Sequence, residues 1–233
     1  MKRSDLYFLG CIIIVTLPFF LSSVPSEIYN QLNATHPYML AFLKFAVLST
    51  IGEMMGLRIK SGSYLFPEFG MAPRAILWGF YGVWIAIAMK TFANGAPAMV
   101  ESLGVEGVRA AMTEGGFSYL KLLGAFSISV MMNSIFAPVF MTLHKITDAH
   151  IVSNGGSICC LLRPINMGEA FAKLDWSTQW GFVFKRTIPI FWVPAHTITF
   201  MLPPSSQVLF AALLSIFLGV FLSIAVVISR SKS

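Results

Sequence analysis

The chain has 233 residues, of which 56% are hydrophobic and only 11% are charged. A soluble core of this size could not bury so much apolar surface, so the composition excludes an ordinary water-soluble globular domain. The formal net charge of +6 would suit a nucleic acid, but basic residues of membrane proteins usually mark the cytoplasmic side. The composition therefore predicts an integral membrane protein in a lipid bilayer, with no nucleic-acid partner.

Six segments have about the length at which an α-helix crosses ~30 Å of hydrocarbon. In chain order they are residues 6–24, 38–57, 75–93, 122–143, 187–202 and 208–228. The last two come from 43 residues without a charged side chain, Thr187 to Ser229, in which the turn formers Pro-Pro-Ser-Ser-Gln occupy residues 203–207. The predicted fold class is therefore all-α: one transmembrane domain, residues 1–233, of about six helices with a C-terminal helical hairpin.

The first segment also has features of a signal peptide, because MKRSD supplies a charged start and small residues follow the apolar run. Its 19 uncharged residues are long for such a peptide, and its removal would leave an odd number of helices. Between cleavage and retention, we favour retention.

The basic residues predict the orientation of the chain in the membrane. With the N-terminus on the cytoplasmic side, twelve Lys and Arg residues lie inside and three outside, and Lys44 lies within a span. The three outside are Lys90, Arg109 and Lys121. This distribution places both termini on the cytoplasmic, or equivalent, side.

Glu53 and Lys44 are charged residues well inside a predicted span, where an unpaired charge is costly and indicates function by default. They are nine residues apart on one helix, which places them on opposite sides of its axis, so they do not pair with each other. For Lys44, snorkelling toward the headgroups and a functional role both remain open. For Glu53, which is shorter and follows Gly52, we favour a polar contact inside the bundle.

The fifth span combines Pro194 with His196, Thr197 and Thr199. Proline removes a backbone hydrogen bond and kinks a helix, and nearby polar side chains either repair the freed carbonyl or line a wet path. Pro138 is a second predicted kink. The candidates for a shared polar interior or pore are Glu53, Asn133, His196 and Thr199.

Small residues four positions apart let helices approach closely in lipid. Gly52 and Gly56 form such a pair in the second span. The last span has a longer stripe of small residues, which consists of Ala211, Ser215, Gly219 and Ser223. We interpret both as helix-packing faces. If the stripe faced lipid instead, it would indicate binding of a partner helix.

No HExxH, GxSxG or P-loop signature occurs, and Cys11, Cys159 and Cys160 form no CxxC pair. His144 and Asp148 have the spacing of two metal ligands on one helix face, but no third ligand is near them in the sequence, so we interpret the pair as chance. The sequence thus predicts no catalytic residue, no metal and no cofactor. An enzyme acting on lipid would need a side-chain cluster that only folding assembles.

Four motifs follow one another in a familiar order. YNQLNATHPYMLAFLKFAVLSTIGEMMG contains His36-Pro37 and Gly52-Glu53, PRAILWG contains Arg74 and Gly79, NSIFAPVF begins at Asn133, and the segment around Val193-Pro194 ends the series. From about Tyr29 to Ser223, the chain resembles the membrane family named after the 22-kilodalton peroxisomal membrane protein and the mitochondrial protein Mpv-seventeen. In this chain Asn133-Ser134 stand where the family has Asp-Gln, and Thr199 where it has Asn.

The resemblance implies an integral protein of an organelle inner membrane, of the peroxisome or, in a bacterium, of the plasma membrane. It also implies channel-like passage of small solutes. The leading function hypothesis is therefore a low-selectivity channel or small-solute permeation protein. The alternative is a non-catalytic helical subunit or scaffold of a larger membrane complex, with further copies of the chain or other membrane subunits as partners.

Overall fold

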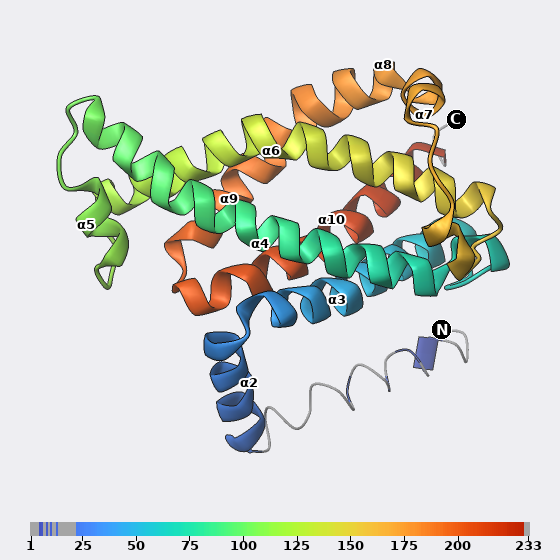
Figure 1. The fold of residues 1–233 in the computed structure, drawn as a ribbon, viewed down its shortest axis with the longest axis horizontal. Coiled ribbons are helices and arrows are strands. Elements are labelled where there is room, and N and C mark those ends of the chain that lie inside the picture. The colour runs from blue at the N-terminus through green and yellow to red at the C-terminus, as the bar shows by residue number, and fades with distance from the viewer. Residues whose placement is uncertain (1–4, 7, 9, 11–12, 14–21, 231–233) are drawn as a thin grey trace. The chain divides into compact units, whose positions relative to one another are not determined.

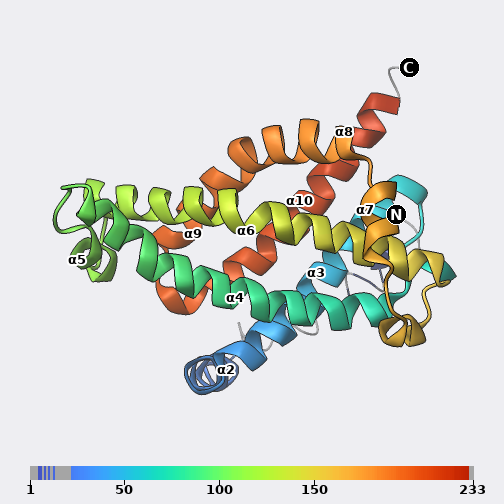
Figure 2. The same cartoon turned by 45° about the horizontal axis from the view of Figure 1, so that its top comes forward.

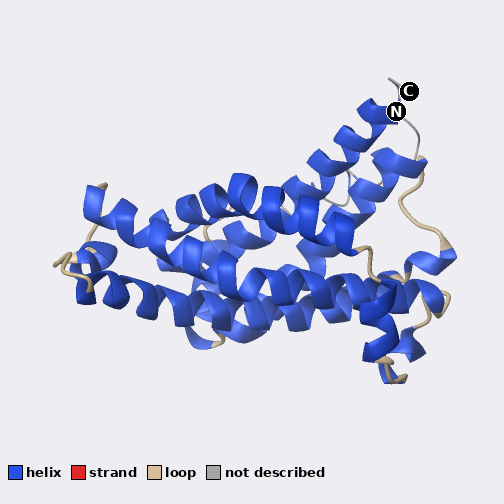
Figure 3. Ribbon diagram, turned by 90° about the horizontal axis from the view of Figure 1, so that it is seen from above, coloured by secondary structure: helices blue, strands red, loops and turns tan. Residues whose placement is uncertain are grey.

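The structure is a computed structural model that describes residues 5–6, 8, 10, 13 and 22–230. All regular secondary structure in these residues is helical (Figure 3), which confirms the predicted all-α class. The chain divides into two compact units, residues 1–40 and 41–233. The single transmembrane domain expected from the sequence stays a prediction.

The first unit contains α2, Val24–Thr35, and the first residues of α3, Pro37–Ser61. Pro25 lies in the first turn of α2, where its missing N–H costs nothing. The helix ends at His36, whose backbone N–H donates to the carbonyl of Leu32 at 2.8 Å. The first predicted span, residues 6–24, falls largely outside the described residues.

Three helical stretches are long and apolar enough to cross a membrane in the part of the chain that the structure describes. They are α3, the stretch Pro67–Ser102 that contains α4 (Met71–Ser102), and α6 (Tyr119–Ser153). They correspond to the second, third and fourth predicted spans. At 32 and 35 residues, α4 and α6 exceed the ~20 residues that a bilayer requires, so they carry additional turns beyond the predicted spans.

The connection between α4 and α6 is itself largely helical. Two glycines with left-handed backbone, Gly104 and Gly107, separate the end of α4 from α5, Val108–Thr113. Ser118 then caps α6 by accepting a hydrogen bond from the backbone N–H of Lys121 at 3.1 Å. Short side chains and positive φ angles thus set the turns where the apolar pattern stops.

Short elements follow α6: η2 (Ile158–Leu162), α7 (Met167–Lys173) and α8 (Trp176–Thr178). Asp175 caps α8, accepting hydrogen bonds from the Thr178 hydroxyl at 2.5 Å and the Ser177 hydroxyl at 2.7 Å. The bond from Thr178, followed by that from Ser177, lowers the pKa of the Asp175 carboxyl to about 2. Asp175 therefore remains ionised throughout the neutral pH range, which favours its place at a helix N-terminus.

The fifth predicted span begins as a wide π-helix, η3 (Gln179–Trp192), and continues as the α-helix α9 (Val193–Met201). Pro189 lies within the π-helical part, and Pro194 lies at the first turn of α9, where the helix narrows. Neither proline can donate a backbone hydrogen bond, so the change of helix type occurs where the regular ladder is already interrupted. The predicted kink at Pro194 thus coincides with a helix junction, and Pro138 lies inside α6.

The C-terminal hairpin consists of α9 and α10, Pro204–Arg230, which contact each other. α9 ends at Met201, and the side-chain amide of Gln207 donates to the carbonyl of Leu202 at 3.0 Å, which stabilises the turn. This turn occurs at the predicted Pro-Pro-Ser-Ser-Gln sequence. Neither α9 nor the described apolar part of α10, Pro204–Val220, reaches spanning length, so the described residues do not confirm six spans.

In the second unit, α6 lies between α4 and α9 (Figures 1 and 2), and α5 packs against one end of α4 and α6. The buried core of this unit is apolar. It includes Phe45, Met89, Ile128, Met132, Phe200 and Ala212. Large apolar side chains also point outward from the middle of these helices, including Phe80, Ile135, Val139 and Ile198. An apolar core inside an apolar exterior is the arrangement that a lipid environment permits.

The small residues of α3 and α10 pack against each other within the chain. A Cβ atom added to Gly52 would lie 2.8 Å from the Cα of Ile216, and one added to Gly219 would lie 3.2 Å from the carbonyl oxygen of Gly52. The hydroxyls of Ser49 and Ser215 are 2.9 Å apart, within hydrogen-bonding distance. Ala211 and Gly56 are buried as well, while Ser223 lies outside the residues whose side chains the structure describes.

Adjacent cysteines in η2 give a direct test of this part of the fold. The side chain of Cys159 is exposed, whereas Cys160 is 1% exposed. Two variants are compared, both with Cys11 replaced by serine: Cys160→Ser retains the exposed Cys159, and Cys159→Ser retains the buried Cys160. We expect a maleimide to label the first variant at least about tenfold faster than the second, because only an accessible thiol reacts. The labelling rate is followed by mass shift. Equal rates in the folded protein would contradict the described η2.

Candidate functional site

A buried arginine at the start of α4 connects three helices. The side chain of Arg74 is 7% exposed, and its Nη1 donates a hydrogen bond to Oε2 of Glu53, on α3, at 2.7 Å. The same nitrogen contacts Oδ1 of Asp148, on α6. Nε donates to the backbone carbonyl of Phe69 at 2.5 Å. One guanidinium thus binds a carboxylate from each neighbouring helix.

The second oxygen of Glu53 has partners of its own. The indole N–H of Trp78 donates to Oε1 at 3.0 Å, and Nε2 of His144 lies 3.2 Å from the same oxygen. The rings of Trp78 and His144 pack with centroids 4.7 Å apart, which fixes the imidazole against the indole. We call Glu53, Arg74, His144 and Asp148 the charged cluster.

Two loops hold Arg74 in place. Gly70 has a φ of +63° and directly precedes α4, so Arg74 lies in the first turn of that helix. Gly156, after α6, approaches Gly70 so closely that a Cβ added to Gly156 would lie 2.3 Å from the carbonyl oxygen of Pro67. The guanidinium carbon of Arg74 also lies 4.6 Å from the centroid of the Phe69 ring. Glycine at both positions therefore lets the loops meet behind the charged cluster.

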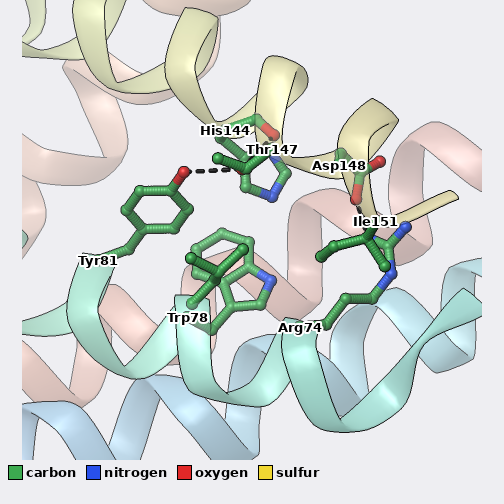
Figure 4. A pocket seen from close by; sticks show the side chains of 8 residues that line it. Arg74, Trp78, Tyr81, His144, Thr147, Asp148 and Ile151 are labelled. Carbon is green, nitrogen blue, oxygen red and sulfur yellow. Dashed lines mark hydrogen bonds and ion pairs between the residues drawn. The ribbon is translucent and has the colours of Figure 1, made fainter. Parts of the chain in front are cut away.

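A small cavity of about 10 Å³ lies beside the charged cluster. Figure 4 shows Arg74, Trp78 and Tyr81 on α4 facing His144 and Asp148 on α6. Tyr81 and Thr147, whose hydroxyls are 2.8 Å apart, also line the cavity. A space of this size holds about one water molecule. The site therefore has room for a single small ligand atom next to the imidazole and the carboxylate.

The charges of this cluster do not cancel. Two carboxylates and one guanidinium leave a net charge of −1 when His144 is neutral. Glu53 and Asp148 are only 20% and 28% exposed, so water screens this charge poorly. An excess negative charge in a partly buried site favours the approach of a cation or a proton.

The candidates predicted for one polar interior occupy two places. All four lie in the second unit: Glu53 belongs to the charged cluster, whereas Asn133 on α6 and His196 and Thr199 on α9 are buried outside that cluster. Among the residues that the structure describes, no hydrogen bond joins Glu53 to the other three. The shared polar interior stays a prediction.

Most polar side chains between α6 and α9 donate hydrogen bonds to backbone carbonyls of their own helix. Asn133 donates to the carbonyl of Ser129 at 2.9 Å, and Thr199 donates to that of Ala195 at 2.9 Å. The Ser129 hydroxyl donates across to the carbonyl of Val193 at 2.7 Å, and the Thr197 hydroxyl donates to the same carbonyl at 2.7 Å. His196 stacks on Trp192 with ring centroids 5.2 Å apart.

The fold supplies a third neighbour for the pair of His144 and Asp148. The sequence offers no third ligand near them, but folding brings Glu53 from α3, 91 residues before His144, to within 3.2 Å. Arg74, which the sequence indicates only as a basic residue at the cytoplasmic end of a span, lies between the two carboxylates. One signal was present: Gly52-Glu53 and Arg74 with Gly79 are two of the motifs that carry the family resemblance, and they meet at this site.

Comparisons of the chain with protein-family models, with curated proteins and with solved structures found no match.

Proposed function

We propose that the chain is an integral membrane protein through which small solutes pass with low selectivity, and that the charged cluster holds the passage closed. The observation that carries this proposal is the buried network in which Arg74 binds Glu53 and Asp148. Charged side chains within membrane helices are rare and costly, and they mark substrate and ion paths or proton relays. A network that connects α3, α4 and α6 is suited to control how these helices separate.

The outer surface of the second unit supports a location in the bilayer. Apolar side chains such as Phe80, Ile135 and Phe217 are exposed on helices whose inner faces are also apolar. Such surfaces are stable in lipid and aggregate in water. We propose a bacterial plasma membrane or an organelle inner membrane, with both termini on the cytoplasmic or equivalent side, as the basic residues indicate.

Membership of the Mpv-seventeen family is part of this proposal. Its support is the resemblance to that family, together with one direct contact between its motifs and one link that runs through Ser129, a residue outside them. Arg74 binds Glu53, and Ser129, which also accepts from Asn133, donates to Val193 of the terminal motif. Motifs that are far apart in the sequence are expected to contact each other when both are needed for the same fold.

The alternative, a membrane scaffold whose small-residue stripe binds a partner helix, has less support. Three members of the stripe are engaged within the chain: Ala211 is buried, Ser215 contacts Ser49, and Gly219 lies against Gly52. A stripe already packed against α3 leaves little surface for another helix.

Efflux from liposomes tests the permeation proposal. Purified wild-type chain and Glu53→Gln are reconstituted at equal density, and release of an entrapped small uncharged sugar is recorded. A hydrogen bond to a charged group contributes about 1.5–3 kcal/mol, and each ~1.4 kcal/mol changes a rate tenfold. We therefore expect Glu53→Gln to raise efflux by about tenfold, because it weakens the contacts that hold α3 against α4 and α6.

Glu101→Gln is the matched control. Glu101 is on the same helix as Arg74 but pairs with the exposed Arg109, away from the charged cluster. Liposomes with the Glu101→Gln variant should therefore release sugar at the same rate as liposomes with the wild type. His196→Ala tests whether the second polar group contributes. Liposomes with folded wild-type and Glu53→Gln protein that release sugar no faster than protein-free liposomes would contradict the proposal.

A further inference from the structure

We propose that Glu53, His144 and Asp148 form a binding site for one divalent transition-metal ion of the Zn²⁺ class. The three side chains come from α3 and α6. Each offers one ligand atom, and these atoms all lie within 4.8 Å of one another. The inference concerns metal binding alone and does not depend on solute permeation.

The spacing of the ligand atoms fits a single ion. Metal bonds of about 2.0–2.2 Å to nitrogen and oxygen place ligand atoms about 3–4 Å apart around the ion. Nε2 of His144 and Oε1 of Glu53 are already 3.2 Å apart. Asp148 is one helical turn after His144, so both project from the same face of α6 toward α3. A small closure of the three side chains would complete the geometry.

The ligand types indicate the class of metal. One imidazole and two carboxylates are hard to intermediate ligands, which favour Zn²⁺, Mn²⁺ or Fe²⁺ over Ca²⁺ or Cu⁺. Three protein ligands leave a fourth position open. The cavity lined by Tyr81 and Thr147 lies beside His144 and has room for one water molecule in that position.

The surrounding groups orient the ligands as the outer shell of a metal site does. Trp78 donates to Oε1 of Glu53, and Arg74 binds Oε2 of Glu53 and Oδ1 of Asp148. Arg74 thus uses one oxygen of each carboxylate. Its positive charge opposes a second cation, but the cluster carries −1 without the metal and would carry only +1 with it. The net charge therefore permits a divalent ion in addition to the arginine.

Equilibrium binding of Zn²⁺ tests the site. The metal-free full-length chain in detergent micelles is titrated with Zn²⁺ in competition with a fluorescent chelator. We expect one tight ion per chain and a loss of affinity of at least about tenfold in Glu53→Gln, His144→Ala and Asp148→Asn. Zinc X-ray absorption of the wild-type complex should show nitrogen and oxygen neighbours, a single imidazole and no sulfur.

The two cysteines of η2 and another histidine supply the control. His150 lies on the same helix and its Nε2 is 3.0 Å from the Cys160 carbonyl oxygen, so His150→Ala combined with Cys159→Ser and Cys160→Ser removes a rival zinc site near η2. This variant should keep the tight ion. Absence of tight binding to the wild type, loss of the ion in the control variant, or sulfur in the absorption spectrum would each overturn the proposal. The spectrum decides even where a ligand variant fails to fold.

Discussion

Arg74→Ala is expected to lower the free energy of unfolding by about 3–5 kcal/mol, the effect of removing one partner from a buried ion pair. Arg74 is 7% exposed and serves two carboxylates at once, so the alanine variant leaves Glu53 and Asp148 facing each other without a counter-charge. It also opens the space that the guanidinium fills beside Phe69. The loss is measured as a shift in the thermal unfolding of the detergent-solubilised protein.

A charge-balanced variant distinguishes lost pairing from lost volume. In Arg74→Ala combined with Glu53→Gln and Asp148→Asn, no uncompensated charge remains, and we expect a substantial part of the stability to return. Arg74→Lys keeps the charge but loses the guanidinium geometry, so it should lie between wild type and Arg74→Ala. If all three variants unfold at the wild-type temperature, Arg74 does not form the contacts described here.

Gly52→Ala is expected to lower the free energy of unfolding by about 1–3 kcal/mol, the usual cost of overpacking a tight contact. The added methyl would lie 2.8 Å from the Cα of Ile216, a backbone atom, so α3 and α10 must move apart. That movement would also weaken the contact between Ser49 and Ser215. Thermal unfolding of the purified variant measures the effect.

Gly95→Ala is the matched control for this substitution. Gly95 also lies inside a long helix, α4, but a Cβ added there meets no described atom within 4 Å. Alanine is the better helix former by about 0.8–1.0 kcal/mol, so this variant should be as stable as the wild type or more stable. Equal loss of stability in both glycine variants would contradict the close packing of α3 and α10.

The sequence predicted the long helices because membrane spans depend on a local property, a sustained run of apolar residues. It was less accurate about their ends, since α4 continues through Pro97 to Ser102 and α6 continues to Ser153. These extensions contain polar residues that a hydrophobicity criterion rejects, and in α4 also Pro97, which removes one backbone hydrogen bond without ending the helix. Where a long helix ends depends on caps and turns, such as the turn at Gly104 after α4, and composition alone does not reveal them.

The charged cluster could be predicted only in part. Glu53 was found because an acidic side chain inside a span is costly wherever its partners are. His144 and Asp148 were not recognised, because they lie beyond the predicted end of their span and their third neighbour is on another helix. Which helices are adjacent follows from packing, for example from Gly79 and Gly82 against Phe42 and Phe45, and a single sequence does not specify that pairing.

The ion pair between Arg74 and Glu53 also bears on how the chain is made. Glu53 leaves the ribosome 21 residues before Arg74, whereas Asp148 follows Arg74 by another 74 residues. If α3 entered the bilayer alone, its glutamate would meet hydrocarbon with no counter-charge. In a membrane, α3 and α4 should therefore leave the insertion machinery together as one hairpin, in which Arg74 and Glu53 neutralise each other. Asp148 then joins Arg74 when α6 follows.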